Sequence, residues 1–264
     1  MKILVIYDGT IKSKTALRYG LVKAKEIGGE LLVLQVFQSS LFVDYDAGPR
    51  AEEIARAEAA RHLRDAETLI RDAGNHGIAV RVLSVEGDPL EEALRVAEVE
   101  HADLILSSPR YKALVKKASC PVHLMPGTIL VPVDSSDTVL EKKATILAEA
   151  RATGSKVLLL GIVPTHLYSG AEKTELEQVM KETKATVNKI KSALSKEGVE
   201  VLEVTRSGYP DEEILKAVDE YSVSLIMLPA GGKMPSELTK AAAILLDEPE
   251  RVRMPIKLMQ VAEA

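Results

Sequence analysis

The chain has few aromatic residues and a single cysteine. Of its 264 residues, 3% are aromatic and none is tryptophan, so side chains on which nucleic-acid bases could stack are scarce. The core must therefore be built from Leu, Val, Ile and Ala. Cys120 cannot form a disulfide within the chain, which favours a reducing compartment, and we expect a cytoplasmic protein.

Positive charge and long apolar runs are limited as well. The net charge is −5 and the pI about 5.7, whereas a duplex-binding surface needs clustered Lys and Arg to neutralise phosphates. The first apolar run, residues 3–7, is too short for a signal-peptide core or a membrane span. We therefore expect no nucleic-acid partner and no insertion into a membrane.

The most informative feature is an internal duplication. "KILVIYDGT" at 2–10 is echoed by "TILVPVDSS" at 128–136, and each run ends in an aspartate followed by small polar residues. A second pair, 85–106 and 205–227, repeats a glycine, a proline and an apolar run in the same order. Each half of the chain is therefore expected to carry the same structural elements.

Within each half, strand and helix patterns alternate. The expected strands lie near 2–7, 31–37, 78–85, 103–107 and 121–125, and near 128–133, 156–163, 199–206, 223–228 and 255–261. Continuous apolar runs such as "LLVLQVF" are typical of parallel strands buried on both faces. The pattern predicts two doubly wound α/β domains, residues 1–126 and 127–264.

The segment that follows the second strand has helical periodicity. One stripe of this helix is expected to carry Ala55, Ala59, His62, Ala66, Leu69 and Ala73. His62 is expected to pack on its own helix, and Gly74 to end it. Before this helix and its counterpart, the irregular segments 38–50 and 164–172 are expected to lie at the carboxyl rim of the sheets and to be more mobile than the strands.

These elements together resemble the universal stress protein family. The ordered set is Asp-Gly-Thr at 8–10, Gly-Asp-Pro at 87–89, "ADLIL" at 102–106 and "CPVHLM" at 120–125, and it recurs in the second half. The resemblance is to a tandem member. It implies a Rossmann-like, five-stranded parallel sheet per half, similar to adenine nucleotide alpha-hydrolases. It also implies that the two domains pair through their last strands as a pseudo-dimer. A homodimer of whole chains is a further alternative that stays open, although no residue argues for it.

The resemblance also implies where a nucleotide would bind. In the nucleotide-binding branch, the aspartate after the first strand lies near adenine and ribose. A Gly-x-x-Gly, nine residues and Gly-Ser/Thr then wrap the phosphates, because glycines allow backbone N–H groups to approach closely. In the first half, Ser107 and Arg110 stand at the two glycine positions, and Cys120 follows too soon for the rest of the motif. The first site, with Asp8, is therefore expected to be degenerate and not to bind ATP.

The second half keeps more of the motif. Leu228 and Gly231 stand at the glycine positions, but Ala241-Ala242 replaces Gly-Ser. The candidate nucleotide-binding residues carried over from the family are Pro132, Asp134, Ser135, Val163, Gly231 and Gly232. A purely structural interpretation is also open: the aspartates end strands and cap helices, and the glycines form a turn before a helix near Ser236.

Three functions follow from this pattern. The first is a non-enzymatic stress-response or signalling module that acts through contacts with an unknown protein partner. The second is a switch that binds ATP or another adenine nucleotide in the second domain only. The third, an ATP pyrophosphatase, needs a Ser-Gly-Gly-x-Asp-Ser loop that neither "DGTIKS" nor "DSSDTV" supplies. No catalytic residue is assigned, and the histidine spacing indicates no metal site.

Overall fold

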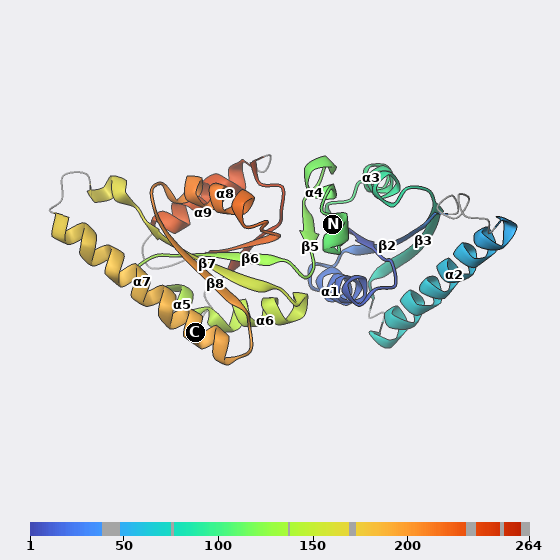
Figure 1. The fold of residues 1–264 in the computed structure, drawn as a ribbon, viewed down its shortest axis with the longest axis horizontal. Coiled ribbons are helices and arrows are strands. Elements are labelled where there is room, and N and C mark those ends of the chain that lie inside the picture. Colours follow the sequence, from blue (N-terminus) through green and yellow to red (C-terminus); the bar gives the residue numbers. More distant parts are fainter. Residues whose placement is uncertain are drawn as a thin grey trace. The chain divides into compact units, whose positions relative to one another are not determined.

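The computed structural model describes residues 1–38, 48–74, 77–136, 138–168, 173–230, 236–248 and 251–259. The chain divides into two compact units, Met1–Met125 and Pro126–Ala264, here called the first and second domains. Each is an α/β domain built on one five-stranded sheet (Figure 1).

All strand pairs in the first domain are parallel. The strands are β1 (Lys2–Ile6), β2 (Glu30–Phe37), β3 (Ala79–Glu86), β4 (Leu104–Ser107) and β5 (Val122–Leu124). Their order across the sheet is β3-β2-β1-β4-β5. The order reverses between β1 and β4, so the topological switch point lies where these two strands end.

The second sheet repeats this arrangement. Its strands are β6 (Thr128–Val133), β7 (Lys156–Val163), β8 (Val201–Ser207), β9 (Leu225–Pro229) and β10 (Ile256–Met259), in the order β10-β9-β6-β7-β8. The registers match as well. Ile6 lies opposite Leu34 in the first sheet, and Pro132 lies opposite Leu160 in the second, 126 residues later on both strands. The predicted fold class is confirmed.

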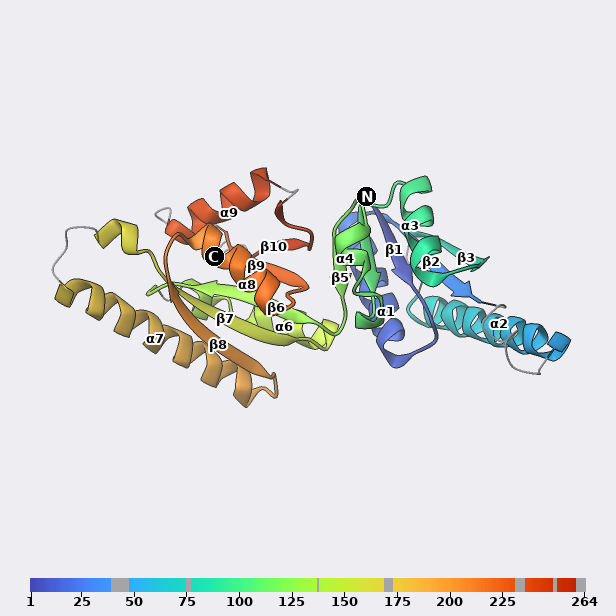
Figure 2. The same cartoon turned by 45° about the horizontal axis from the view of Figure 1, so that its top comes forward.

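Helices cover both faces of each sheet (Figures 1 and 2). In the first domain they are α1 (Ile11–Ile27), α2 (Gly48–Asp72), α3 (Pro89–Val99), the 3₁₀ turn η2 (Pro109–Tyr111) and α4 (Leu114–Lys117). In the second they are α5 (Thr138–Glu141), α6 (Lys143–Thr153), η3 (Thr165–Tyr168), α7 (Lys173–Lys196), α8 (Pro210–Glu220) and α9 (Glu237–Asp247).

The cores follow from strand alternation. Ile3 and Val5 pack with α1 and α2, whereas Leu4 and Ile6 on the same strand pack with α3 and α4. In the second domain Ile129 packs with α6 and α7 and Leu130 packs with α8 and α9. Both faces of each sheet are therefore buried, as the continuous apolar runs predicted.

Local signals set the helix boundaries that shape the sheet edges. The side chain of Asp88 accepts hydrogen bonds from the N–H groups of Leu90 and Glu91, and Pro89 is the first residue of α3. The helix predicted to start near Ser236 is α9, and the Ser236 side chain caps it by accepting from the N–H of Thr239. One detail of the helical stripe is wrong: Ala73 is exposed, because α2 ends at Asp72. Residues 39–47 and 169–172 of the predicted rim segments lie outside the described ranges.

Candidate functional site

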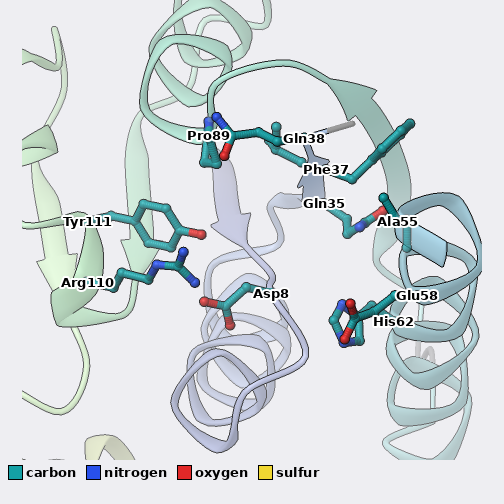
Figure 3. A pocket seen from close by; sticks show the side chains of 12 residues that line it. Asp8, Gln35, Phe37, Gln38, Ala55, Glu58, His62, Pro89, Arg110 and Tyr111 are labelled. Atoms are coloured by element: carbon teal, nitrogen blue, oxygen red, sulfur yellow. The ribbon is translucent and has the colours of Figure 1, made fainter. Parts of the chain in front are cut away.

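A pocket of about 280 Å³ lies at the carboxyl edge of the first sheet. Side chains from the ends of β1, β2 and β4 and from α2 and the start of α3 line it (Figure 3). This edge includes the switch point between β1 and β4, where open α/β sheets bind ligands. The pocket is therefore the candidate functional site.

Asp8 follows β1 and forms one wall of the pocket. Its Oδ1 atom accepts hydrogen bonds from the N–H (3.2 Å) and the hydroxyl (2.6 Å) of Thr10. Thr10, not Asp8, is the residue that caps α1, so the structural interpretation of Asp8 as a helix cap is corrected: it supports the cap. Its other oxygen, Oδ2, is buried and has no hydrogen-bond partner among the described residues.

His62 packs against the backbone of Gly9. Gly9 has a φ of +74°, and a Cβ there would lie 2.4 Å from the His62 ring. A glycine is needed at this turn both for its backbone conformation and for the space that the imidazole occupies. The predicted packing of His62 on its helix thus has a specific partner, and the ring forms part of the pocket wall.

Two glutamines at the end of β2 are functional candidates that the sequence analysis missed. Gln35 is 3% exposed, and its Oε1 accepts a hydrogen bond from the Ser84 hydroxyl at 2.8 Å. Gln38 donates to Asp88 at 3.4 Å, which joins this strand end to the start of α3. The available signal was Gln35 itself, a polar residue inside the apolar run "LLVLQVF".

The segment after β4 contributes Arg110 and Tyr111. The Arg110 guanidinium lies 5.8 Å from the centre of the Tyr111 ring, and both side chains line the pocket. Burial raises the pKa of the Tyr111 hydroxyl to about 12, so it is a hydrogen-bond donor at neutral pH. The structure thus brings Asp8 and Arg110 to one pocket. Ser107 is buried and does not line it, and its hydroxyl donates to the Ser108 carbonyl.

The backbone of this segment is occupied by its own turns. The N–H groups of Tyr111, Lys112, Val115, Lys116 and Ala118 all donate to carbonyls between Ser108 and Leu114. Pro109 has no N–H. The side chains of Tyr111 and Leu114 are buried in the core below. These backbone N–H groups, which a phosphate-binding loop would present to an anion, are therefore already hydrogen-bonded within the segment.

In the second domain, Asp134 makes the same turn as Asp8. Its Oδ1 accepts hydrogen bonds from the N–H of Ser136 (2.9 Å) and from its hydroxyl. Ser135 is exposed, and its carbonyl accepts from Thr186 of α7 at 3.5 Å. Val163 is fully buried at the end of β7.

The remaining candidates of the second domain have different outcomes. Pro132 is buried within β6, opposite Leu160 of β7, so the ends of these two strands lie side by side. Gly231 and Gly232 lie outside the described residues. Ala241 and Ala242 lie in the middle of α9 and pack into the core. Since alanine has no hydroxyl and both side chains lie in the core, this pair offers no hydrogen-bonding group at the sheet edge.

The edge of the second sheet carries a cluster that the sequence did not predict. The His166 ring of η3 stacks on Tyr209 at 4.5 Å, and its Nε2 lies 3.1 Å from Glu237 of α9. Hydrogen bonds from Lys240 and His166 hold the pKa of the Glu237 carboxyl below its usual range. The cluster joins η3 to the starts of α8 and α9, so side chains of the domain itself cover this part of the edge.

Other chemistry-bearing groups are inert or dispersed. Cys120 is partly buried, and burial raises the pKa of its thiol to about 11, so it is not a thiolate at neutral pH. No group of three His, Cys, Asp or Glu side chains among the described residues could hold a metal ion. In the same part of the chain, no helix combines the length and apolarity needed to cross a membrane.

The fold and site can now be compared with known proteins. No curated protein matches the chain. A universal stress protein from Archaeoglobus fulgidus is 17% identical, with 98% of both chains covered and a TM-score of 0.43. A family protein from Burkholderia pseudomallei is 28% identical over 47% of this chain and 95% of that one, with a TM-score of 0.41. One from Arabidopsis thaliana, solved with AMP bound, is 19% identical over 47% and 90%, with a TM-score of 0.36.

The family comparison is decisive. The model of the universal stress protein family matches residues 1–110 and again residues 125–241, which together make up most of the chain. The first match ends at Arg110, where the segment after β4 begins its short turns. The chain therefore belongs to the universal stress protein family and carries two copies of its domain.

Proposed function

We propose that this universal stress protein is a non-enzymatic stress-response or signalling module of the cytoplasm that acts through protein contacts, and that its first domain does not bind ATP. The observation that carries the proposal is the closed segment after β4. A phosphate loop needs free backbone N–H groups, and here five of them are bonded within the segment. The four-residue α4 is also too short to offer a helix N-terminus to an anion.

The chemistry of the first domain supports a binding role rather than catalysis. The single cysteine is held as a thiol by burial. Among the described side chains that line the pocket with Asp8 and Arg110, the hydroxyl is that of Tyr111, and its pKa is raised to about 12, so it is a poor nucleophile at neutral pH. We therefore assign no catalytic residue.

A surface suited to protein contacts lies on the other end of the first domain. A groove between α1 and α2 is lined by apolar side chains that include Leu21, Val22, Leu69 and Ile78, with Arg18 at its margin. Val22 is 58% exposed. Apolar surface bordered by charge is typical of interaction sites.

Calorimetry with ATP and AMP on the intact chain tests the nucleotide part of the proposal, and a phosphate-release assay tests the absence of catalysis. We expect no binding in the first domain and no turnover. Binding of ATP at two sites with micromolar affinity would overturn the proposal, as would steady release of phosphate that depends on Asp8.

The second candidate function is an adenine-nucleotide switch in the second domain only. The observation in its favour is that β9 is followed by a full helix, α9, whose N-terminus is capped by Ser236, after the glycines at 231 and 232. Ala241 and Ala242 supply no hydroxyl, and loss of such a hydrogen bond costs roughly 1.5–3 kcal/mol, or about ten- to a hundredfold in affinity.

Gly231→Val distinguishes the two candidates. One weak ATP site that this substitution abolishes would favour the switch over the protein-contact module. The test also covers Asp134, because Asp134→Asn should weaken the same site if its carboxylate contacts the nucleoside. Unchanged calorimetry in both variants would leave the module as the better proposal.

Pairing of the two domains remains a prediction. β5 and β10 are edge strands of their sheets. Each pairs with a neighbouring strand of its own sheet on one side only, so the backbone groups on its other side could pair with another strand. We propose that these edges pair as a pseudo-dimer. A crystal structure in which β5 and β10 make no mutual contact would contradict this.

A further inference from the structure

Two opposite charges line the first-domain pocket without forming an ion pair. Asp8 Oδ2 is buried without a hydrogen-bond partner, and Arg110 has no carboxylate within 4.0 Å among the described residues. Figure 3 shows the Asp8 carboxylate and the Arg110 guanidinium on the same side of the pocket. A buried carboxylate oxygen without a donor costs free energy, so a ligand that supplies the donor would bind with that cost recovered.

Two neutral donors face the same space. Gln35 is 97% buried, its oxygen is bonded to Ser84, and its Nε2 has no partner in the described part of the chain. The Tyr111 hydroxyl points into the pocket beside Arg110 (Figure 3). Burial keeps this hydroxyl protonated, because its pKa is raised to about 12. Arg110, Tyr111 and Gln35 therefore offer donors, whereas Asp8 offers an acceptor.

The rest of the lining leaves room for a small apolar group. Phe37, Ala55 and Ala59 form part of the wall, and both alanines are almost fully buried. Glu58 at the margin is exposed and paired with Arg61. Among the described residues, the unpaired charges of Asp8 and Arg110 inside the pocket are one negative and one positive, and a ligand with one of each would match them.

We propose that this pocket binds a small zwitterion, an amino acid or a close analogue, with its ammonium group on Asp8 and its carboxylate on Arg110 and Tyr111. The inference rests on the proposed function in one respect: the pocket is not occupied by ATP. It goes further by assigning a ligand class to a domain whose nucleotide motif is degenerate.

The test uses the intact chain. Each standard amino acid is screened at millimolar concentration for a rise in Tm, and the strongest is measured by calorimetry. Its N-acetyl derivative, which has no ammonium group, and its amide, which has no carboxylate, are measured in parallel. We expect one site for the free amino acid and loss of detectable binding for both derivatives.

Variants assign the site. Asp8→Asn and Arg110→Gln should each weaken the amino acid's affinity roughly ten- to a hundredfold, as expected for a lost hydrogen bond to a charged group. Tyr111→Phe should weaken it about two- to tenfold. The matched control is Lys112→Gln, which removes an exposed positive charge two residues beyond Arg110 that does not line the pocket.

The outcomes separate this inference from the proposed function. If no amino acid binds, or if the N-acetyl derivative binds as tightly as the free amino acid, the zwitterion site is overturned while the proposed function stands. If ATP displaces a bound amino acid, the proposed function fails but the zwitterion site does not. If Asp8→Asn unfolds the chain, which circular dichroism would reveal, Arg110→Gln and the two derivatives still decide.

Discussion

The two domains share one frame but differ at the edges where their strands end. Registers align Gln35 and Ser84 of the first sheet with Gly161 and Thr205 of the second. In the first domain a large polar side chain reaches the pocket. In the second, a Cβ at Gly161 would lie 3.0–3.3 Å from side chains of Thr205 and α7, so the space is already filled.

A second difference lies beneath the edge. At the position of Ala16 in α1, the second domain has Lys142, 126 residues later, and both residues are buried. The Lys142 ammonium donates to the carbonyls of Ala230 and Met259, where β9 and β10 end. Lys142 and the His166 cluster therefore make contacts within the second domain at the edge where its strands end. At the same edge of the first domain, the charged side chains of Asp8 and Arg110 face a pocket. Divergence after duplication has thus changed the edges and kept the sheets.

The largest effect is expected from Lys142→Met. The substitution keeps the side-chain volume but removes the ammonium group from the carbonyls of Ala230 and Met259, of which that of Met259 still accepts from the Ala230 N–H at 3.1 Å. Since a hydrogen bond from a charged group contributes about 1.5–3 kcal/mol, and the loss of two is partly offset because the buried charge is removed as well, we expect a loss of roughly 2–4 kcal/mol in the free energy of unfolding. Chemical denaturation measures it, and hydrogen exchange should place the change in β9 and β10.

Lys143→Met is the control, because Lys143 is the exposed neighbour on α6. We expect its free energy of unfolding to stay within about 0.5 kcal/mol of the wild type. Equal effects of the two substitutions would mean that the edge of the second sheet does not depend on the buried ammonium.

A smaller effect is expected from Gly9→Ala in the first domain. The left-handed backbone at Gly9 and the 2.4 Å approach of its Cβ to the His62 ring both oppose the change. We expect a loss of about 1–3 kcal/mol in the free energy of unfolding, measured by chemical denaturation. Ser135→Ala, at the same turn of the second domain, should change it by less than about 0.5 kcal/mol.

The double variant with His62→Ala separates the two causes. Removal of the ring relieves the clash but not the backbone strain, so Gly9→Ala should cost less on this background. An undiminished cost would show that the imidazole does not limit the space above Gly9.

The fold could be predicted from the sequence more completely than the candidate site. Both sheets were predictable because the apolar runs, the glycines that end helices and Pro89 act locally and recur in both halves. Asp8 and Arg110 were found through the family motif. Gln35 was not, because a single polar residue in an apolar strand has no periodic signal. The Lys142 contacts were hidden for another reason: they join α5–α6 to strand ends 88 and 117 residues away.

The smallest effect on stability is expected at the ion pairs that join the third strand of each domain to the end of the helix that follows it. Arg81 of β3 bonds Glu100 at the end of α3, and Arg206 of β8 bonds Glu220 at the end of α8. Lys2 also donates to Glu100, at 3.0 Å. The hydrogen bonds from Arg81 and then Lys2 lower the pKa of the Glu100 carboxyl to about 2, from 4.5, whereas that of Glu220 is lowered chiefly by Arg206.

The sign of the pH dependence follows from these shifts. Because the folded pKa of Glu100 lies below the unfolded one, its contribution to stability is complete above pH 4.5 and is lost as the pH falls towards about 2. Glu100→Gln should therefore lower Tm at neutral pH by a small amount that vanishes near pH 2, and added salt should reduce it because the pair is at the surface. Glu220→Gln should do the same to a lesser extent, since Arg206 is the one cation paired with the Glu220 carboxylate among the described residues. Thermal melts of both variants across this range check the order, and a Tm difference for Glu100→Gln that stays constant down to about pH 2 would contradict the assignment of the acid dependence to this carboxyl.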